Sequence, residues 1–159
     1  MKDFLKLKMF HVKHSANYRI LDQSFKTYLT STQYKVFGCI SKQRQYFKRF
    51  DKVSHKTLKH ILGYVIFLIN QDEVDVIYIC VLPQYRRQGI ASKLLNVSRE
   101  TLRIKKMFLE VSVHNFCAIA FYEALGFTPL SIRQKYMNGH DAYLMSKTFS
   151  QTDYSYCKF

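Results

Sequence analysis

The residues with the clearest chemical potential lie at positions 81–91, where an apolar stretch is followed by a short basic loop and then by a helical pattern that begins at a small residue. The first N–H groups of a helix have no partner within the helix and carry a partial positive charge, so they can bind phosphate. Gly89 would let the backbone approach a ligand closely, and Arg86 and Arg87 add positive charge. The pattern indicates an anion-binding site, and an ordinary strand-to-helix turn is the alternative interpretation.

Two further side chains could transfer protons. Glu110 alternates with Leu109 and Val111 in a strand-like stretch, and a carboxylate among apolar residues is costly unless it has a partner or a task. Such a carboxylate can act as a general base. Tyr122 follows Ala118 on one helical face, and its phenol is neutral at pH 7 but can donate a proton. A structural carboxylate and a core aromatic are the alternative interpretations.

The hydrophobic pattern predicts the elements that would position these residues. Helical spacing is found at 15–29, 91–104 and 115–125, and strand-like patterns are found at 34–41, 61–69, 74–82, 107–113, 127–137 and 140–148. Residues 70–73 and Asn138-Gly139 are typical of hairpin turns, and Gly126 stands where a helix often ends. Because 61–69 and 74–82 are almost continuously apolar, both faces of these strands are expected to be covered. The predicted fold class is α/β, a mixed and mostly antiparallel sheet flanked by helices.

The composition predicts a single globular domain. A chain of 159 residues with 48% hydrophobic and 16% aromatic content is expected to fold as one unit over 1–159. It has no apolar run long enough to cross a membrane and no apolar signal segment near its start, so a cytoplasmic location without membrane contact is expected. The histidines and cysteines lack metal-ligand spacing, so no metal is expected. Cys39, Cys80, Cys117 and Cys157 are predicted to be free thiols in mostly buried positions.

The charge distribution is strongly basic. The net charge is +14, which attracts polyanions such as RNA or ribosomes. Residues 42–60 carry seven Lys or Arg side chains and one Asp. A long solvated loop is one interpretation of this segment, and a patch for an anionic partner is the other. The polar tail at 150–159 is expected to be frayed.

A family resemblance adds to the physical interpretation of the basic loop. Arg86-Arg87-Gln88-Gly89-Ile90-Ala91 resembles the Gln/Arg-x-x-Gly-x-Gly/Ala motif of the GCN5-related N-acetyltransferase (GNAT) superfamily. The resemblance implies that acetyl-CoA is the cosubstrate and that the backbone amides of residues 86–91 hold its pyrophosphate. It also implies that the main chain of Ile79, Cys80 and Val81 pairs with the pantetheine arm. Ala91 departs from the more frequent glycine, a change that the family tolerates.

A second block resembles the later part of the same family. It comprises Leu109-Glu110-Val111, Asn115, Ala118, Tyr122, Leu125-Gly126-Phe127, Arg133, Tyr136 and the turn at 138–142. The likeness runs from about residue 61 to residue 149 and is greatest to the bacterial ribosomal-protein-alanine N-acetyltransferases. The first sixty residues match poorly, and 42–60 looks like an insertion.

The resemblance implies a role for each side chain of the second block. Glu110 would take the proton of the amine, and Tyr122 would donate a proton to the departing CoA thiolate. Asn115 would contact the cofactor arm and could also cap a helix. Arg133 and Tyr136 would line the groove for the acceptor.

The resemblance also implies an overall mechanism. The neighbouring parallel strands at 74–81 and 107–113 would splay apart around acetyl-CoA, and the acetyl group would move directly to the amine in a ternary complex. The favoured acceptor is the N-terminal alanine of a small-subunit ribosomal protein. Acetylation of a small amine, such as a polyamine or an aminoglycoside, is one alternative. A catalytically inactive module that binds ribosomes or RNA through residues 42–60 is another, and the oligomeric state, monomer or dimer, stays open.

Overall fold

The structure is a computed structural model that describes residues 31–41, 45–49, 60–137 and 139–150. The helix expected at 15–29, the tail beyond residue 150 and Cys157 therefore lie outside the described residues, as does most of the basic segment at 42–60. Within the described part, none of the helices is long and apolar enough to cross a membrane.

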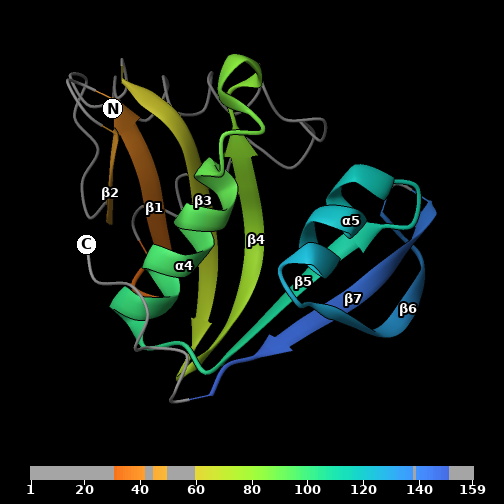
Figure 1. Ribbon diagram of the computed structural model, residues 1–159. Helices are drawn as coiled ribbons and strands as arrows, with labels where there is room; N and C mark the ends of the chain where they lie inside the picture. The colour runs from red at the N-terminus through yellow and green to blue at the C-terminus, as the bar shows by residue number, and fades with distance from the viewer. Residues whose placement is uncertain (1–30, 42–44, 50–59, 138, 151–159) are drawn as a thin grey trace.

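The described chain forms a seven-stranded mixed sheet with two α-helices (Figure 1). The elements are β1 Tyr34–Ser41, β2 Gln45–Arg49, β3 Ile61–Asn70, β4 Glu73–Val81, a short 3-10 turn Pro83–Tyr85, α4 Ile90–Leu102, β5 Lys106–Ser112, α5 Phe116–Ala124, β6 Thr128–Met137 and β7 His140–Thr148. Their order across the sheet is β2-β1-β3-β4-β5-β7-β6. The β4–β5 pair is parallel and the other pairs are antiparallel. This confirms the predicted mixed, mostly antiparallel sheet.

One strand was not predicted. β2 lies inside the basic segment that the sequence presented as a solvated loop or a charged patch, and it pairs antiparallel with β1. Phe47 explains the difference, because its side chain packs against the main hydrophobic cluster while the Lys and Arg residues around it dominate the local composition. A charge-rich edge strand therefore has the same composition as a loop.

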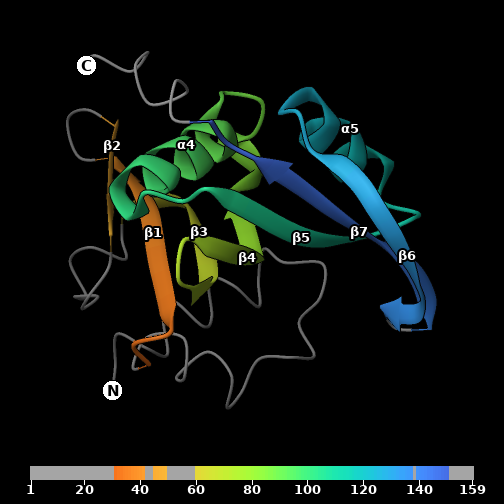
Figure 2. The same ribbon diagram turned by 90° about the horizontal axis from the view of Figure 1, so that it is seen from below.

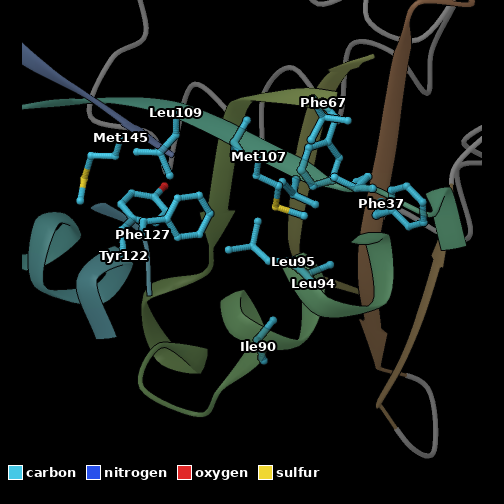
Figure 3. Close-up of a cluster of buried hydrophobic side chains, with 14 of the residues drawn as sticks. Phe37, Phe67, Ile90, Leu94, Leu95, Met107, Leu109, Tyr122, Phe127 and Met145 are labelled. Carbon is cyan, nitrogen blue, oxygen red and sulfur yellow. The ribbon is translucent and has the colours of Figure 1, made fainter. Parts of the chain in front are cut away.

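The core lies on both faces of the sheet. The larger cluster joins α4 and α5 to one face, through residues that include Leu94, Leu109 and Tyr122 (Figure 3). A second cluster on the other face includes Tyr64 and Ile66 of β3. Every residue of β3 from Ile61 to Phe67 is buried, so the prediction that both faces of this strand are covered is confirmed.

The two helices cover different halves of one face. In Figure 1, α4 lies in front of β1, β3 and β4, and α5 lies in front of β5 and β7. The amphipathic pattern of α4 buries Leu94, Leu95 and Ser98 against the sheet. α5 ends before Gly126, whose φ of 84° is readily adopted by glycine alone, as its predicted C-terminal position requires. Figure 2 shows β6 as the outer edge of the sheet beyond β7.

Candidate active site

The candidate site forms where β4 and β5 separate. Their parallel pairing runs from Glu73–Lys106 to Val76–Leu109 and ends there, although both strands continue. The β3–β4 register shifts next to Phe67, which leaves Ile77 as an extra residue on β4 at the same point. Figure 1 shows the two strands together at one end and diverging toward the other. The predicted splay of the two parallel strands is confirmed.

The diverging half of β4 turns toward β5 main-chain groups that no longer pair with that strand. Leu82 N donates to Leu62 O at 2.8 Å. Because bonded and non-bonded residue pairs alternate along an antiparallel ladder, Cys80 bonds to β3, whereas Ile79 and Val81 turn their N–H and C=O groups toward the gap. Of the three residues expected to pair with the pantetheine arm, Ile79 and Val81 thus face the gap, while the main chain of Cys80 faces β3.

The opposite wall of the gap belongs to β5. Val113 N donates to Asp141 O at 3.1 Å, so the residues that alternate with Val113 are the ones that turn away from β7. Glu110 consequently points its main-chain N–H and C=O groups toward β4, whereas the carbonyl of Ser112 accepts from Asn115 N at 2.9 Å. Main-chain donors and acceptors therefore line both walls of the gap.

The basic loop follows the end of β4 and is held by its own side chains. Arg86 Nε donates to Val81 O at 3.1 Å, and Gln88 Nε2 donates to Gln84 O at 3.2 Å. Arg87 and Gly89 both have positive φ values, 62° and 75°, which curl the backbone just before α4. Arg86 thus positions the loop as well as adding the charge that the sequence indicated.

The start of α4 has the features of an anion-binding helix end. Gly89 is its N-cap, so no side chain caps the helix, and the first intrahelical bond runs from Lys93 N to Gly89 O at 3.0 Å. The N–H groups of Ile90 and Ala91 therefore have no partner within the helix. A Cβ at Gly89 would meet nothing within 4 Å, so the space in front of this backbone is open. These residues fit a bound pyrophosphate.

Glu110 belongs to a compact polar cluster. Its Oε1 lies 3.1 Å from Arg133 Nε, and it accepts a hydrogen bond from the Tyr136 hydroxyl, which raises the pKa of that tyrosine. The Arg133 guanidinium also lies 5.1 Å from the centre of the Tyr136 ring. The structure therefore brings together Glu110 of β5 and Arg133 and Tyr136 of β6. The sequence analysis had assigned these residues to one acceptor site.

Asp75 of β4 is a second carboxylate that the sequence interpretation missed. It pairs with Phe108, two residues before Glu110, so both carboxylates leave the sheet on the same face. Its side chain is exposed, but its carboxyl is partly desolvated. This desolvation, and then the negative charge of Glu110, raises the pKa of Asp75, while Arg133 acts in the opposite direction. A carboxylate in an otherwise apolar strand was the available signal, as it was for Glu110.

Tyr122 lies on the other side of the sheet. It is buried on α5 and lies beside Phe127 (Figure 3). Its ring centre is 5.6 Å from that of Phe127 and 5.1 Å from that of Phe121. Burial raises the pKa of its hydroxyl from 10.0 to about 12. Because Leu109 belongs to the same cluster and Glu110 alternates with it, Tyr122 and Glu110 lie on opposite faces of the sheet.

The remaining sequence candidates have clear positions. Asn115 caps α5, since its Oδ1 accepts from Ala118 N at 3.2 Å, and this confirms the capping role. Cys39 and Cys80 are buried free thiols, as predicted. Cys117 is a free but exposed thiol, because the short helix α5 buries only Tyr122 deeply and leaves its outer face in solvent.

This fold and site define the class of the protein. Residues 15–127 match the Acetyltransferase (GNAT) family, and the chain belongs to this family, whose members use acetyl-CoA. Within it, the chain is 42% identical over 77 residues to the N-alpha-acetyltransferase of Saccharolobus solfataricus, covering 45% of this chain and 46% of the relative. It is 37% identical over 77 residues to the [Ribosomal protein bS18]-alanine N-acetyltransferase of Escherichia coli K12, covering 46% and 52%. The match spans about half the length of these curated relatives.

Solved structures agree on the fold. The ribosomal-protein-S18-alanine N-acetyltransferase from Escherichia coli superposes with a TM-score of 0.66 at 24% identity, over 100% of this chain and 95% of that chain. Arabidopsis thaliana NAA60 in complex with a bisubstrate analogue superposes with a TM-score of 0.71 at 18% identity, over 92% of each chain. At these identities the superpositions establish the shared architecture.

Proposed function

We propose that this chain is a protein N-terminal acetyltransferase, which transfers the acetyl group of acetyl-CoA to the α-amine of a polypeptide. The observation that carries the proposal is the end of the β4–β5 ladder at Val76–Leu109, beyond which the two strands diverge and main-chain groups of each are turned toward the other. The uncapped start of α4 supplies an anion site after β4, and a cluster with two carboxylates stands on the opposite face. The relatives named N-alpha-acetyltransferases support the α-amine as the acceptor.

Acetyl-CoA would be bound by main chain more than by side chains. The N–H groups of residues 87–91 would hold the pyrophosphate, since Arg86 N donates to Pro83 O at 3.2 Å. The outward-facing main chain of Ile79 and Val81 would pair with the pantetheine arm. The N–H of Val81 would help polarise the thioester carbonyl. Asn115 uses Oδ1 to cap α5, which leaves its Nδ2 as the group that could reach the cofactor arm.

Proton transfer is assigned to Glu110 and Tyr122 from opposite faces of the sheet. Glu110 would take the proton of the incoming amine, directly or through water, after which the amine attacks the thioester in a ternary complex. Tyr122 would donate the hydrogen of its hydroxyl to the departing thiolate. Its pKa of about 12 keeps the hydroxyl protonated at neutral pH. The pKa of the Tyr122 hydroxyl exceeds that of an ordinary thiol, which is about 8.5. Tyr122 would therefore first stabilise the thiolate sulfur by donating a hydrogen bond, and the proton would move afterwards.

The finer proposal is that the acceptor is the N-terminal alanine of a small-subunit ribosomal protein. It is supported by the names of several relatives, including the Escherichia coli enzyme and a putative bS18-alanine N-acetyltransferase of Bacillus subtilis that is 32% identical over 97 residues. The net charge of +14 would favour the approach to a ribosome-associated acceptor.

The test is release of CoA thiol from acetyl-CoA with synthetic peptides as acceptors. One peptide copies the N-terminus of ribosomal protein S18 from the same organism, and others begin with serine or methionine. We expect turnover that disappears when the α-amine is blocked, and fastest turnover with the alanine peptide. Turnover with polyamines alone would contradict the proposal, and acetyl-CoA binding without turnover on any amine would indicate an inactive module.

A matched pair of variants tests the assignment of Glu110. Glu110→Gln should lower kcat by about 100-fold or more, since general base catalysis contributes on the order of 10² to 10⁴. Glu123→Gln, which removes the same charge from an exposed position on α5, should leave kcat unchanged. Equal effects of the two substitutions, or an unchanged kcat in Glu110→Gln, would remove Glu110 from this role.

A further inference from the structure

The half-buried side chain of Lys147 on β7 reaches the C-terminal end of α5. Its Nζ donates to Leu125 O at 2.6 Å. The side chain also passes beside Gly126, where an added Cβ would meet Lys147 Nζ at 3.5 Å and Cε at 3.7 Å. A lysine at the last carbonyls of a helix complements the negative end of the helix dipole. Lys147 therefore joins the sheet to the end of the helix that carries Tyr122.

The charge of Lys147 is held without a carboxylate. Among the residues that the structure describes, no Asp or Glu oxygen lies within ion-pair distance of its Nζ. The ammonium lies 5.0 Å from the centre of the Phe149 ring, which the guanidinium of Arg99 also approaches to 5.0 Å. Because a half-buried ammonium is unfavourable unless fixed acceptors replace water, the carbonyl of Leu125 takes the place that a carboxylate usually has.

The turn that Lys147 holds also fixes Tyr122. The main-chain oxygen of Tyr122 accepts from Leu125 N and from Phe127 N, both at 3.0 Å. The ring centre of Phe127 lies 5.6 Å from that of Tyr122 (Figure 3). Met145, two residues before Lys147 and on the same face of β7, belongs to the cluster that buries Tyr122. A movement of the turn would therefore move Tyr122.

We propose that Lys147 is a positioning residue for Tyr122, which holds the end of α5 against β7 and so keeps the Tyr122 hydroxyl where the CoA thiolate departs. This inference rests on the proposed function and deepens it. Lys147 itself exchanges no proton in the reaction. Since a displacement of about 1 Å can cost on the order of 100-fold in rate, a tether away from the reacting atoms can act on kcat.

The test is a double-mutant cycle between Lys147 and Tyr122, measured by thiol release with a peptide acceptor. Lys147→Met keeps an unbranched side chain and removes the donor, so kcat should fall about 10- to 100-fold. The KM values for acetyl-CoA and for the peptide should stay within about twofold of wild type, because neither substrate loses a contact. Lys147→Arg, which can still donate to Leu125 O, should keep kcat within about threefold of wild type. In the Tyr122→Phe background, Lys147→Met should lower kcat by less than about twofold, because the hydroxyl that it positions is gone.

Lys106→Met is the matched control. Lys106 of β5 is also half-buried, and its Nζ lies 4.7 Å from the centre of the Phe108 ring. It alternates with Met107, which pairs with Lys147, so it points to the opposite face of the sheet. Lys106→Met removes the same charge without touching α5, and it should leave kcat unchanged.

A spectroscopic measurement separates positioning from a general loss of stability. In protein with isotope-labelled tyrosine rings, the NMR signal that is missing from Tyr122→Phe identifies Tyr122. This signal should shift in Lys147→Met, and it should stay in place in Lys147→Arg and Lys106→Met. Thermal unfolding of each variant confirms that it is folded at the temperature of the assay.

Several results would overturn the inference. An unchanged kcat in Lys147→Met, or an equal fall of kcat in the Tyr122→Phe background, would show that Lys147 does not act through Tyr122. A change in KM alone would assign Lys147 to substrate binding instead. If Lys147→Met does not fold, Lys147→Gln takes its place in the cycle and is judged by the same criteria.

Failure of the proposed function gives a different result. If wild type acetylates peptides and Tyr122→Phe keeps full kcat, the role of Tyr122 fails and the inference fails with it. If wild type acetylates none of the peptides, the proposed function fails, and the NMR signal alone decides whether Lys147 positions Tyr122.

Discussion

The substitution Tyr122→Phe separates a catalytic tyrosine from one that only fills the core. Tyr122 is 7% exposed, and desolvation alone raises the pKa of its hydroxyl to about 12. Phenylalanine keeps the ring contacts with Phe121 and Phe127 and removes only the oxygen.

The structure sets the expected magnitudes. Phenylalanine keeps the packed ring, and a single hydrogen bond of a hydroxyl contributes about 1 kcal/mol net, so Tyr122→Phe should be within about 1 kcal/mol of wild type in stability. For a chain of this size that corresponds to a Tm within about 2 to 4 °C of the wild-type value. If the hydroxyl donates to the leaving thiolate, kcat should nevertheless fall about 100-fold or more.

The pH dependence of stability gives an independent measure. Because the pKa of Tyr122 is raised on folding, the folded state holds the phenolic proton more tightly, and this stabilisation is complete below pH 10. It is lost as the pH rises from 10 toward 12, by about 2 to 3 kcal/mol at 1.36 kcal/mol per pH unit. Tyr122→Phe should lack this component, so the difference in unfolding free energy between wild type and variant should change over that range.

The assay is thiol release with a peptide acceptor, combined with urea unfolding at neutral and alkaline pH. A variant that keeps full kcat would refute the catalytic assignment. A variant that loses several kcal/mol at neutral pH would refute the structural reasoning, because it would show that the hydroxyl has a strong partner in the folded protein.

Two further substitutions test the scaffold of the site. In Gly63→Ala, the added Cβ would lie 2.8 Å from Cys80 O and 3.0 Å from Val81 Cγ2. We expect the free energy of unfolding in urea to fall by about 1 to 3 kcal/mol. Because β4 must shift, acetyl-CoA should also bind more weakly in calorimetry. Unchanged stability would show that β3 and β4 adjust freely. Asn115→Ala removes the cap of α5 and should lower the free energy of unfolding by about 1 kcal/mol, measured by thermal unfolding. Asn115→Asp should keep the cap. Equal stability of wild type and both variants would contradict the capping role.

Local patterns allowed most elements to be predicted. The strand at 34–41 was predicted with the bounds that the structure has, and the helix at 91–104 differs from α4 by one or two residues at each end. These predictions succeeded because they depend on signals encoded within a few residues: the periodicity of hydrophobic residues, the helix cap at Asn115 and the helix end at Gly126. β2 was missed because its strand character depends on pairing with β1 and on the burial of Phe47.

The candidate site was predicted in part. Glu110, Tyr122 and the basic loop were found from residue type and spacing, and the family resemblance added Arg133 and Tyr136. The ion pair between Glu110 and Arg133 joins β5 to β6, and no local pattern specifies such a contact. Asp75 was missed for the same reason, because it belongs to the site only through the register of β4 against β5.

The sequence by itself determined the elements, the basic loop before α4 and the types of residue that could carry out acyl transfer. Tertiary structure alone decided that the β4–β5 ladder stops at Val76–Leu109 and that Tyr122 and Glu110 lie on opposite faces of the sheet. It also decided which of two neighbouring carboxylates is neutralised. The physical reason is that strand register and charge pairing depend on residues far apart in the chain, whereas helix, strand and turn signals are local.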